Sequence, residues 1–210
     1  MSAETPAISA HGLARDYGER RALAGVELAL AAGGTLAVLG PNGSGKTTLL
    51  RILAGLLRPS AGEVSVLGCP LPGETWRLRG RVGFLGHDPL LYRDLTGREN
   101  LRLAARLYGL KPERAEERIE ELLSAVGMER RGDDRVAELS AGMAQRVAVC
   151  RTILHDPELL LLDEPDSHLD PAAREAVRAL LDPGDGRTRV IVSHERERVL
   201  AEADVALELG

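Results

Sequence analysis

A glycine-rich stretch between an apolar run and a helical segment constrains this chain more than any other feature. It fits the pattern G-x-x-x-x-G-K-[ST] with the residues Gly40-Pro41-Asn42-Gly43-Ser44-Gly45-Lys46-Thr47. Residues 35–39 before it are predicted to form a strand, and residues 46–57 a helix. Glycines let successive backbone N–H groups turn inward, and the helix N-terminus adds partial positive charge. The pattern therefore predicts a strand–loop–helix unit that cradles a polyphosphate.

This loop supplies the contacts expected for a nucleoside triphosphate bound with Mg²⁺. Lys46 is expected to bridge the β- and γ-phosphates, and the Thr47 hydroxyl to bind the metal. Only Lys46 and Lys111 are lysines among the 27 basic residues. Because a planar guanidinium would misplace its donors in the cradle, we expect Lys46 to be irreplaceable. The predicted nucleotide-binding residues here are Gly40, Pro41, Asn42, Gly43, Ser44, Gly45, Lys46, Thr47 and Thr48.

Two carboxylates and a histidine follow predicted strands further along the chain. The apolar run 159–163 ends in Asp163, and Glu164 comes next. A buried strand that delivers an acid at its C-terminal end can hold Mg²⁺ opposite a phosphate loop, so we predict Asp163 as a metal residue. Glu164 is predicted to act on the attacking water, and His194 to donate a hydrogen bond to the γ-phosphate. The predicted catalytic residues are Glu164, His194 and Lys46.

The hydrophobic patterning predicts an α/β fold in a single domain of 210 residues. Strands are expected in the short apolar runs at residues 7–13, 22–30, 35–39, 63–67, 82–85, 159–163 and 189–193. The first two are expected to pair antiparallel. From about residue 89 to 155 the apolar spacing becomes helical, and a further helix is expected at 172–181. We therefore predict a P-loop NTPase core (residues 1–88 and 156–210) with an N-terminal antiparallel β portion and an inserted all-helical lobe.

Charge, cysteine content and hydropathy exclude several classes of protein. The net charge is −5 with no basic block, so we expect no nucleic-acid partner. Cys69 and Cys150 lack metal-site spacing and are expected to be buried, reduced thiols. The first residues resemble no signal peptide, and no apolar stretch reaches the roughly 20 residues of a membrane-spanning helix. We expect a cytoplasmic protein that reaches the inner face of the membrane only through a partner.

The segment Leu139-Ser140-Ala141-Gly142-Met143, about twenty residues before Asp163, resembles the LSGGQ signature of ABC-transporter ATPases. The resemblance covers essentially the whole chain and implies the ABC ATPase fold. Ser140 and Gly142 are then expected to receive a phosphate bound by a second copy, at the N-terminus of a helix that Ser140 caps. Two copies would sandwich two ATP molecules. Tyr17 matches the aromatic residue on which the adenine stacks, and residues 167–170 match the D-loop, with Asp170 as its acid.

Two segments depart from the family pattern. In the region of the Q-loop, the chain reads Phe84-Leu85-Gly86-His87-Asp88-Pro89, which places His87 where the family usually has glutamine. An imidazole can accept one hydrogen bond or bind a water near Mg²⁺, so we include His87 among the predicted metal residues. The signature departs at Ala141, which stays small, and at Met143, which is apolar.

The resemblance implies an ATP-hydrolysing subunit that uses ATP and Mg²⁺, dimerises, and drives transport through separate transmembrane permease subunits. Gly86-His87 and the Leu-Ser-Ala-Gly string resemble the haem-exporter ATPase of cytochrome c maturation. Residues 92–100 are similar in ATPases of drug, polysaccharide and copper-processing exporters, which form the alternative. A soluble ABC ATPase of DNA repair or translation is a further alternative. A small P-loop kinase or GTPase would not explain the signature.

Overall fold

The computed structural model describes residues 6–182 and 186–210, which form two compact units. Of these residues, the first unit holds 6–84, 158–164 and 186–210, and the second holds 85–157 and 165–182. The sequence predicts residues 1–88 and 156–210 in the core, whereas residues 85–88, 156–157 and 165–182 group with the second unit. The largest difference is the segment 165–182. This segment groups with the second unit because helix α5 (Pro171–Leu181) packs on helix α4 (Ala141–Ile153).

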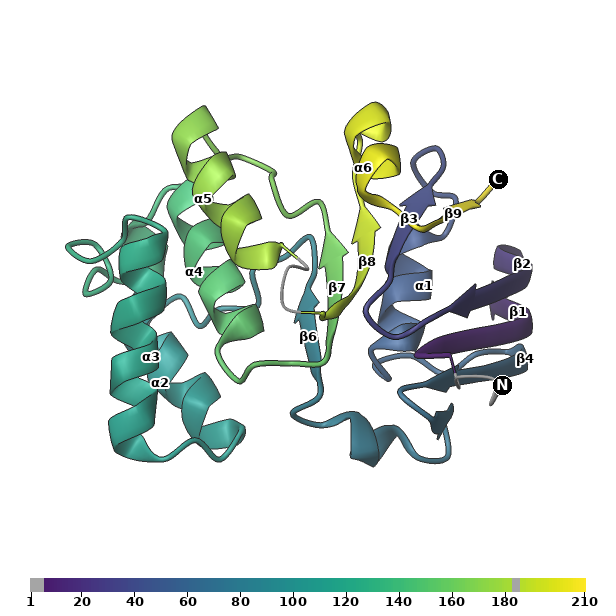
Figure 1. Ribbon diagram of the computed structural model, residues 1–210, viewed down its shortest axis with the longest axis horizontal. Helices are drawn as coiled ribbons and strands as arrows, with labels where there is room; N and C mark the ends of the chain where they lie inside the picture. The colour runs from purple at the N-terminus through teal and green to yellow at the C-terminus, as the bar shows by residue number, and fades with distance from the viewer. Residues whose placement is uncertain (1–5, 183–185) are drawn as a thin grey trace. The chain divides into compact units, whose positions relative to one another are not determined.

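A five-stranded sheet forms the centre of the first unit (Figure 1). Its order is β6 (Val82–Leu85), β7 (Leu159–Asp163), β8 (Thr188–Val192), β3 (Thr35–Leu39) and β9 (Val205–Glu208). The pairs β7–β8, β8–β3 and β3–β9 are parallel. Every residue of β3, β7 and β8 is buried, which explains why these strands appear in the sequence as continuous apolar runs. Parallel strands deliver their carboxyl ends to one edge of the sheet.

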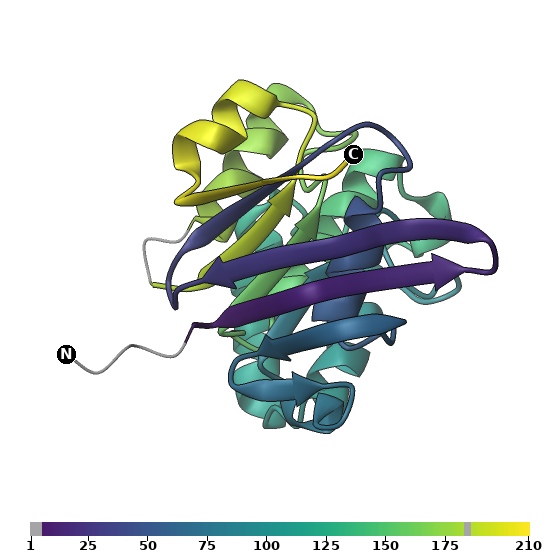
Figure 2. The ribbon, with the colours of Figure 1, turned by 90° about the vertical axis from the view of Figure 1, so that its right-hand side faces the viewer.

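A second, antiparallel sheet in the same unit is ordered β2 (Arg20–Leu30), β1 (Ile8–Tyr17), β4 (Ala61–Val66) and β5 (Cys69–Leu71) (Figure 2). The predicted antiparallel pairing of the first two strands is confirmed, with Ile8 opposite Leu30. Helix α1 (Lys46–Leu53) contacts β2 of this sheet and both β7 and β8 of the other. One hydrophobic core joins the helix to the two sheets.

Several boundaries differ from the sequence prediction. Helix α1 ends at Leu53 rather than at residue 57, because Gly55 adopts a left-handed backbone (φ 71°) that closes the helix. A Cβ at Gly55 would lie 2.4 Å from Thr75 Cγ2 in the short 3₁₀ helix η1 (Thr75–Leu78), so this position needs glycine. Strands β5 and β9 and helix α6 (Arg196–Glu202) were not predicted from the sequence.

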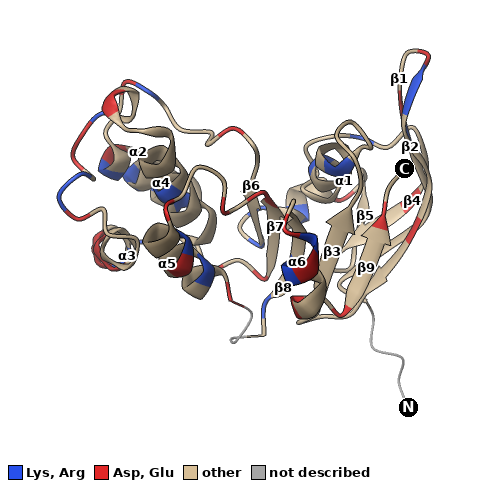
Figure 3. Cartoon of the chain, turned by 90° about the horizontal axis from the view of Figure 1, so that it is seen from above, with Lys and Arg blue, Asp and Glu red and all other residues tan. Residues whose placement is uncertain are grey.

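The second unit is helical, as predicted for residues 89–155. It contains α2 (Gly97–Leu107), α3 (Pro112–Ala125), the 3₁₀ turn η2 (Val136–Glu138), α4 and α5. Thr96 and Glu99 form a capping box at the start of α2, and Pro112 opens α3. Figure 3 colours the charged residues along the ribbon and shows both signs on these helices. Arg102 of α2 binds Glu116 of α3 through two hydrogen bonds of 2.7 Å, which adds a polar tie to the apolar packing.

The N-terminus of α4 packs against the loop that precedes α5. A Cβ at Gly142 would lie 2.4 Å from the carbonyl oxygen of His168, and Gln145 Nε2 donates a hydrogen bond to the Pro165 carbonyl at 3.3 Å. His168 itself has a left-handed backbone, with φ 64°. The signature segment and the segment 165–170 are therefore in direct backbone contact within this unit.

Over residues 6–182 and 186–210, no helix is both long and apolar enough to cross a membrane. Cys69 and Cys150 are free and buried, as predicted, and burial raises the pKa of the Cys150 thiol to about 12.

An ion pair at the start of β7 predicts a pH-dependent contribution to stability. Arg81 donates to both carboxylate oxygens of Glu158, at 2.6 and 2.9 Å, and these bonds lower the pKa of Glu158. Because the pKa of Glu158 is lower in the folded state than in the unfolded state, its ionised form stabilises the fold at pH values above the unfolded-state pKa. This stabilisation is lost as the pH falls through the folded-state pKa. We expect Glu158→Gln to reduce the free energy of unfolding by about 0.5–1 kcal/mol at pH 7, given the exposure of the pair.

The check is chemical denaturation at several pH values. The difference between Glu158→Gln and the parent should shrink below about pH 4, where the carboxylate takes up its proton. Glu63→Gln on the exposed face of β4 serves as the control, because Glu63 forms no ion pair with any described residue. A difference that is constant from pH 3 to pH 7 would contradict the assignment.

Gly142→Ala tests the contact between α4 and residue 168, because the contact and helix propensity predict opposite changes in the free energy of unfolding. Helix propensity alone would make the alanine variant more stable by about 1 kcal/mol. The close approach to the His168 carbonyl predicts instead a loss of about 1–3 kcal/mol, because the neighbouring backbone must move. Thermal unfolding distinguishes the two signs, and Ala141→Gly at the exposed neighbouring position measures the propensity effect separately. A stabilised Gly142→Ala would exclude the contact.

Candidate nucleotide-binding site

The predicted phosphate loop joins β3 to α1 as the sequence pattern requires. Helix α1 begins at Lys46 after Gly45, whose φ is 98°. The Lys46 ammonium donates hydrogen bonds to the carbonyl oxygens of Gly40 (2.7 Å) and Pro41 (2.8 Å). These bonds hold the ammonium across the loop, where phosphate oxygens could replace the carbonyls as acceptors.

Two glycines of the loop are required by close backbone neighbours. A Cβ at Gly40 (φ 141°) would lie 2.2 Å from the carbonyl oxygen of Leu209, and one at Gly45 would lie 2.2 Å from that of Ala22. Leu209 is the residue after β9 and Ala22 belongs to β2, so the loop is contacted from an edge strand of the antiparallel sheet and from the end of an edge strand of the parallel sheet. The loop backbone is therefore held from both sides.

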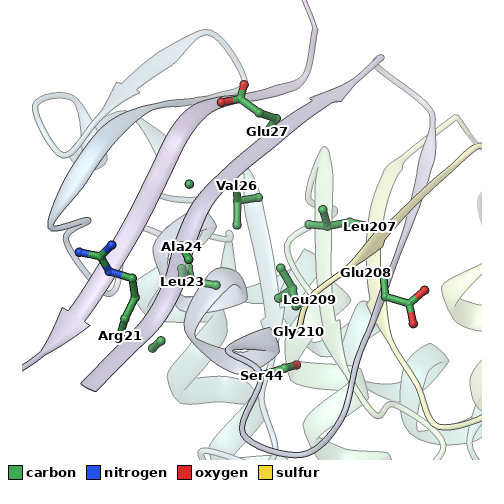
Figure 4. A pocket seen from close by; sticks show the side chains of 12 residues that line it. Arg21, Leu23, Ala24, Val26, Glu27, Ser44, Leu207, Glu208, Leu209 and Gly210 are labelled. Atoms are coloured by element: carbon green, nitrogen blue, oxygen red, sulfur yellow. The ribbon is translucent and has the colours of Figure 1, made fainter. Parts of the chain in front are cut away.

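A pocket of about 350 Å³ adjoins the loop between these two edge strands (Figure 4). Leu23 and Val26 of β2 and Leu207 and Leu209 line it, and Ser44 of the loop lies at one end. The Ser44 hydroxyl is buried and has no hydrogen-bond partner among the described residues. Arg21, Glu27 and Glu208 line the pocket as well, so the loop is bordered on this side by both apolar and charged side chains.

The structure brings Thr47 and Asp163 together. Asp163, at the carboxyl end of β7, is 5% exposed, and its Oδ2 accepts a hydrogen bond of 2.7 Å from the Thr47 hydroxyl. A hydroxyl and a carboxylate are the hard oxygen donors that suit Mg²⁺. No cluster of three or more His, Cys, Asp or Glu side chains that could hold a metal occurs in the described part of the chain. Mg²⁺ is commonly held by one or two protein oxygen ligands together with water and substrate phosphates, a donor set that Thr47 and Asp163 fit.

Glu164 and His194 are also neighbours, at the ends of the adjacent strands β7 and β8. His194 Nε2 lies 2.7 Å from Glu164 Oε1, and both side chains are partly exposed. The Glu164 N–H donates to the Val192 carbonyl, and Glu164 has a left-handed backbone with φ 51°. A non-glycine residue in this conformation is strained, which is a feature of functional positions.

Tyr17 lies at the end of the β1–β2 hairpin, and the hairpin contacts the phosphate loop. Tyr17 pairs with Arg20 across the hairpin, and Arg20 Nη2 donates to the Gly43 carbonyl at 3.2 Å. The Tyr17 side chain is 45% exposed. Arg20 was not predicted from the sequence. The only signal for it was its place opposite Tyr17, across the two-residue turn that joins the strands.

The remaining predicted residues belong to the second unit. Ser140 caps α4, as predicted, with its hydroxyl accepting a hydrogen bond of 3.2 Å from the Met143 N–H. Asp170 caps α5 through the Ala173 N–H at 3.0 Å. His87 is exposed. The first unit therefore contains the phosphate loop, Tyr17, Asp163, Glu164 and His194, and it brings Thr47 to Asp163 and Glu164 to His194. The roles of all these residues, like those of Ser140, Gly142 and His87, stay predictions.

Comparison with known proteins identifies the family. The family model described as "ABC transporter" matches residues 23–167. The chain is 40% identical over 202 residues to a daunorubicin resistance ATP-binding protein of Streptomyces coeruleorubidus, with 94% of this chain and 62% of the relative covered. It is 38% identical over 205 residues to a Nod factor export ATP-binding protein of Ralstonia nicotianae, with 94% and 63% covered. The chain thus spans about three fifths of the length of these curated relatives.

Solved structures agree with this match. An ATP-binding subunit of an ABC transporter superposes with a TM-score of 0.88 at 30% identity, covering 96% of this chain and 85% of the other. A dimeric ATP-binding cassette in a post-hydrolysis state, bound to ADP and Pi, superposes with a TM-score of 0.86 at 29% identity, covering 96% and 94%. The antiparallel sheet, the parallel sheet with its phosphate loop and the helical segment form the ABC ATPase fold, as predicted. This chain belongs to the ABC transporter family.

Proposed function

We propose that this chain binds ATP with Mg²⁺, hydrolyses it, and thereby drives export through separate membrane subunits. The observation that carries the proposal is the 2.7 Å hydrogen bond between Thr47 and Asp163. It joins the phosphate loop to the strand end where Glu164 and His194 lie, so the groups for phosphate binding and for water activation adjoin within one unit. Membership of the ABC transporter family supports the same chemistry.

Each residue of this site has a proposed role. Lys46 exchanges its two carbonyl acceptors for phosphate oxygens, and the loop N–H groups bind the same phosphates. Thr47 and Asp163 hold Mg²⁺, which, when bound, neutralises charge on the phosphates. Glu164 accepts a proton from the attacking water, and His194 donates a hydrogen bond to the γ-phosphate. Tyr17 stacks on the base, and His87 acts as the residue near the metal in place of the family's glutamine.

A second copy of the chain is proposed to complete each site. The N-terminus of α4, capped by Ser140 and containing Gly142, offers N–H groups and partial positive charge to a phosphate held by the partner copy. Similarity to a dimeric ATP-binding cassette supports this arrangement. ATP binding would then close the dimer, and hydrolysis with product release would reopen it.

The names of the relatives support a proposal for the cargo class. Those reported above concern daunorubicin resistance and Nod factor export. They support the alternative of a drug or polysaccharide exporter better than haem export in cytochrome c maturation. We therefore propose a small-molecule exporter whose ATPase subunit attaches to the cytoplasmic face of the membrane through its permease, with no nucleic-acid partner. A soluble ABC ATPase of DNA repair or translation is the second candidate, and the export names favour it less.

Glu164→Gln tests the proposed role of the carboxylate. The amide cannot accept the proton, so hydrolysis should fall while ATP binding persists, and an ATP-bound dimer should accumulate. Size-exclusion chromatography with saturating Mg·ATP measures the dimer, and Glu63→Gln on β4 serves as the control. A Glu164→Gln variant that remains monomeric and hydrolyses ATP at the parental rate would overturn the assignment.

Lys46→Arg tests the geometric requirement for an ammonium. The guanidinium is too broad for the position between the Gly40 and Pro41 carbonyls, so steady-state ATP hydrolysis should fall on the order of a hundredfold. Lys111→Arg, the matched control, changes the other lysine, which is exposed at the start of α3, and should leave the rate unchanged. Equal rates in the two variants would contradict the role of Lys46.

A further inference from the structure

An arginine covers one face of the Tyr17 ring. The guanidinium carbon of Arg15 lies 4.7 Å from the ring centroid, within the range of a cation–π contact. Tyr17 still exposes 45% of its surface. One face of the ring is therefore occupied by protein, and ring surface remains accessible for a ligand.

The position of Arg15 is fixed by the segment that leads into β4. Arg15 Nη1 donates to the Arg58 carbonyl at 3.1 Å. The same segment binds the neighbouring backbone of β1, because the Ser60 N–H donates to the Ala14 carbonyl and the Asp16 N–H donates to the Ser60 hydroxyl. The guanidinium is thus held between a backbone acceptor and the ring, rather than moving freely in solvent.

The ring that Arg15 covers lies on the hairpin that contacts the phosphate loop. Tyr17 pairs with Arg20, and Arg20 binds the Gly43 carbonyl of the loop. A molecule whose phosphates occupy the loop could therefore extend a planar group along the hairpin toward the uncovered ring surface. A cation on one face of an aromatic ring draws electron density toward itself, and the opposite face then attracts an electron-rich π-system more strongly.

We propose that Arg15 is a positioning residue for base recognition: its guanidinium, the Tyr17 ring and the nucleotide base form a three-layered stack. This inference rests on the proposed function, since it takes Tyr17 as the base-stacking residue. Arg15 does not touch the nucleotide. It holds the ring at one orientation and strengthens stacking on the opposite face.

The experiment separates binding of the base from binding of the phosphates. Dissociation constants of Mg·ADP and of Mg·pyrophosphate are measured by titration calorimetry, because neither ligand presents the γ-phosphate and ADP carries the base. Arg15→Gln removes the charge and leaves a neutral, shorter hydrogen-bond donor, and Arg15→Lys keeps a cation on a long side chain. Arg21→Gln is the matched control: it removes the same charge from the same hairpin, where Arg21 pairs with Asp16 rather than with the ring.

Arg15→Gln should raise the dissociation constant of ADP roughly threefold to thirtyfold and leave that of pyrophosphate unchanged. Arg15→Lys should recover part of the loss, and Arg21→Gln should change neither constant. With Tyr17→Leu already present, Arg15→Gln should have no further effect on ADP, because the two side chains act through one stack.

Other outcomes overturn the inference or the function separately. If Arg15→Gln weakens the binding of ADP and of pyrophosphate equally, or changes the binding of neither, Arg15 has no role in base recognition. If it tightens ADP binding, Arg15 competes for the ring face that the base uses, and the proposed order of layers is wrong. If the parent chain binds neither ADP nor pyrophosphate, the proposed function fails, whatever the variants show.

Discussion

The hydrogen bond between the Thr47 hydroxyl and Asp163 connects two segments that are far apart in the sequence. Thr47 is in the first turn of α1, and Asp163 ends a strand whose every residue is buried. Because the strand is packed in the core on both faces, the Asp163 carboxylate has little freedom to move. The hydrogen bond therefore fixes the start of α1 at the end of β7. The phosphate loop, held by backbone contacts from β2 and from the residue after β9, is thereby kept at a constant place relative to Glu164 and His194.

The sequence predicted this part of the molecule well because the signals were local. A run of buried residues marks β3 and β7, and the phosphate loop must lie between a strand and a helix. The contacts that the sequence could not reveal are tertiary. Arg20 reaches Gly43 across 23 residues of sequence. Arg15 and Tyr17 are only two residues apart in β1, but the Arg58 carbonyl that holds the Arg15 guanidinium is 43 residues away. The early end of α1 depends on Gly55 beside Thr75, which are also distant in sequence.

The signature segment of the second unit has structural roles besides the phosphate contact proposed for it. The Ser140 hydroxyl accepts a hydrogen bond from a backbone N–H in the first turn of α4. Gly142, which has no Cβ, allows the His168 carbonyl to lie close to the helix backbone. The substitution of alanine for glycine at position 141 falls on an exposed residue, which explains why the helix accepts it. The grouping of residues 165–182 with these helices follows from the same contacts, and it places the segment 167–170 in the unit that carries the signature.

The left-handed backbone of Glu164 has a consequence for how this chain tolerates change. An acidic side chain is held where glycine or asparagine would fit with less strain. Replacement by either residue would relax the turn after β7 while removing the carboxylate. Under the proposed role of Glu164, stability and activity oppose each other at this position, and selection for heat resistance alone would favour chains that lack the carboxylate. The strain at residue 164 is the thermodynamic cost of placing a carboxylate at the end of a buried strand.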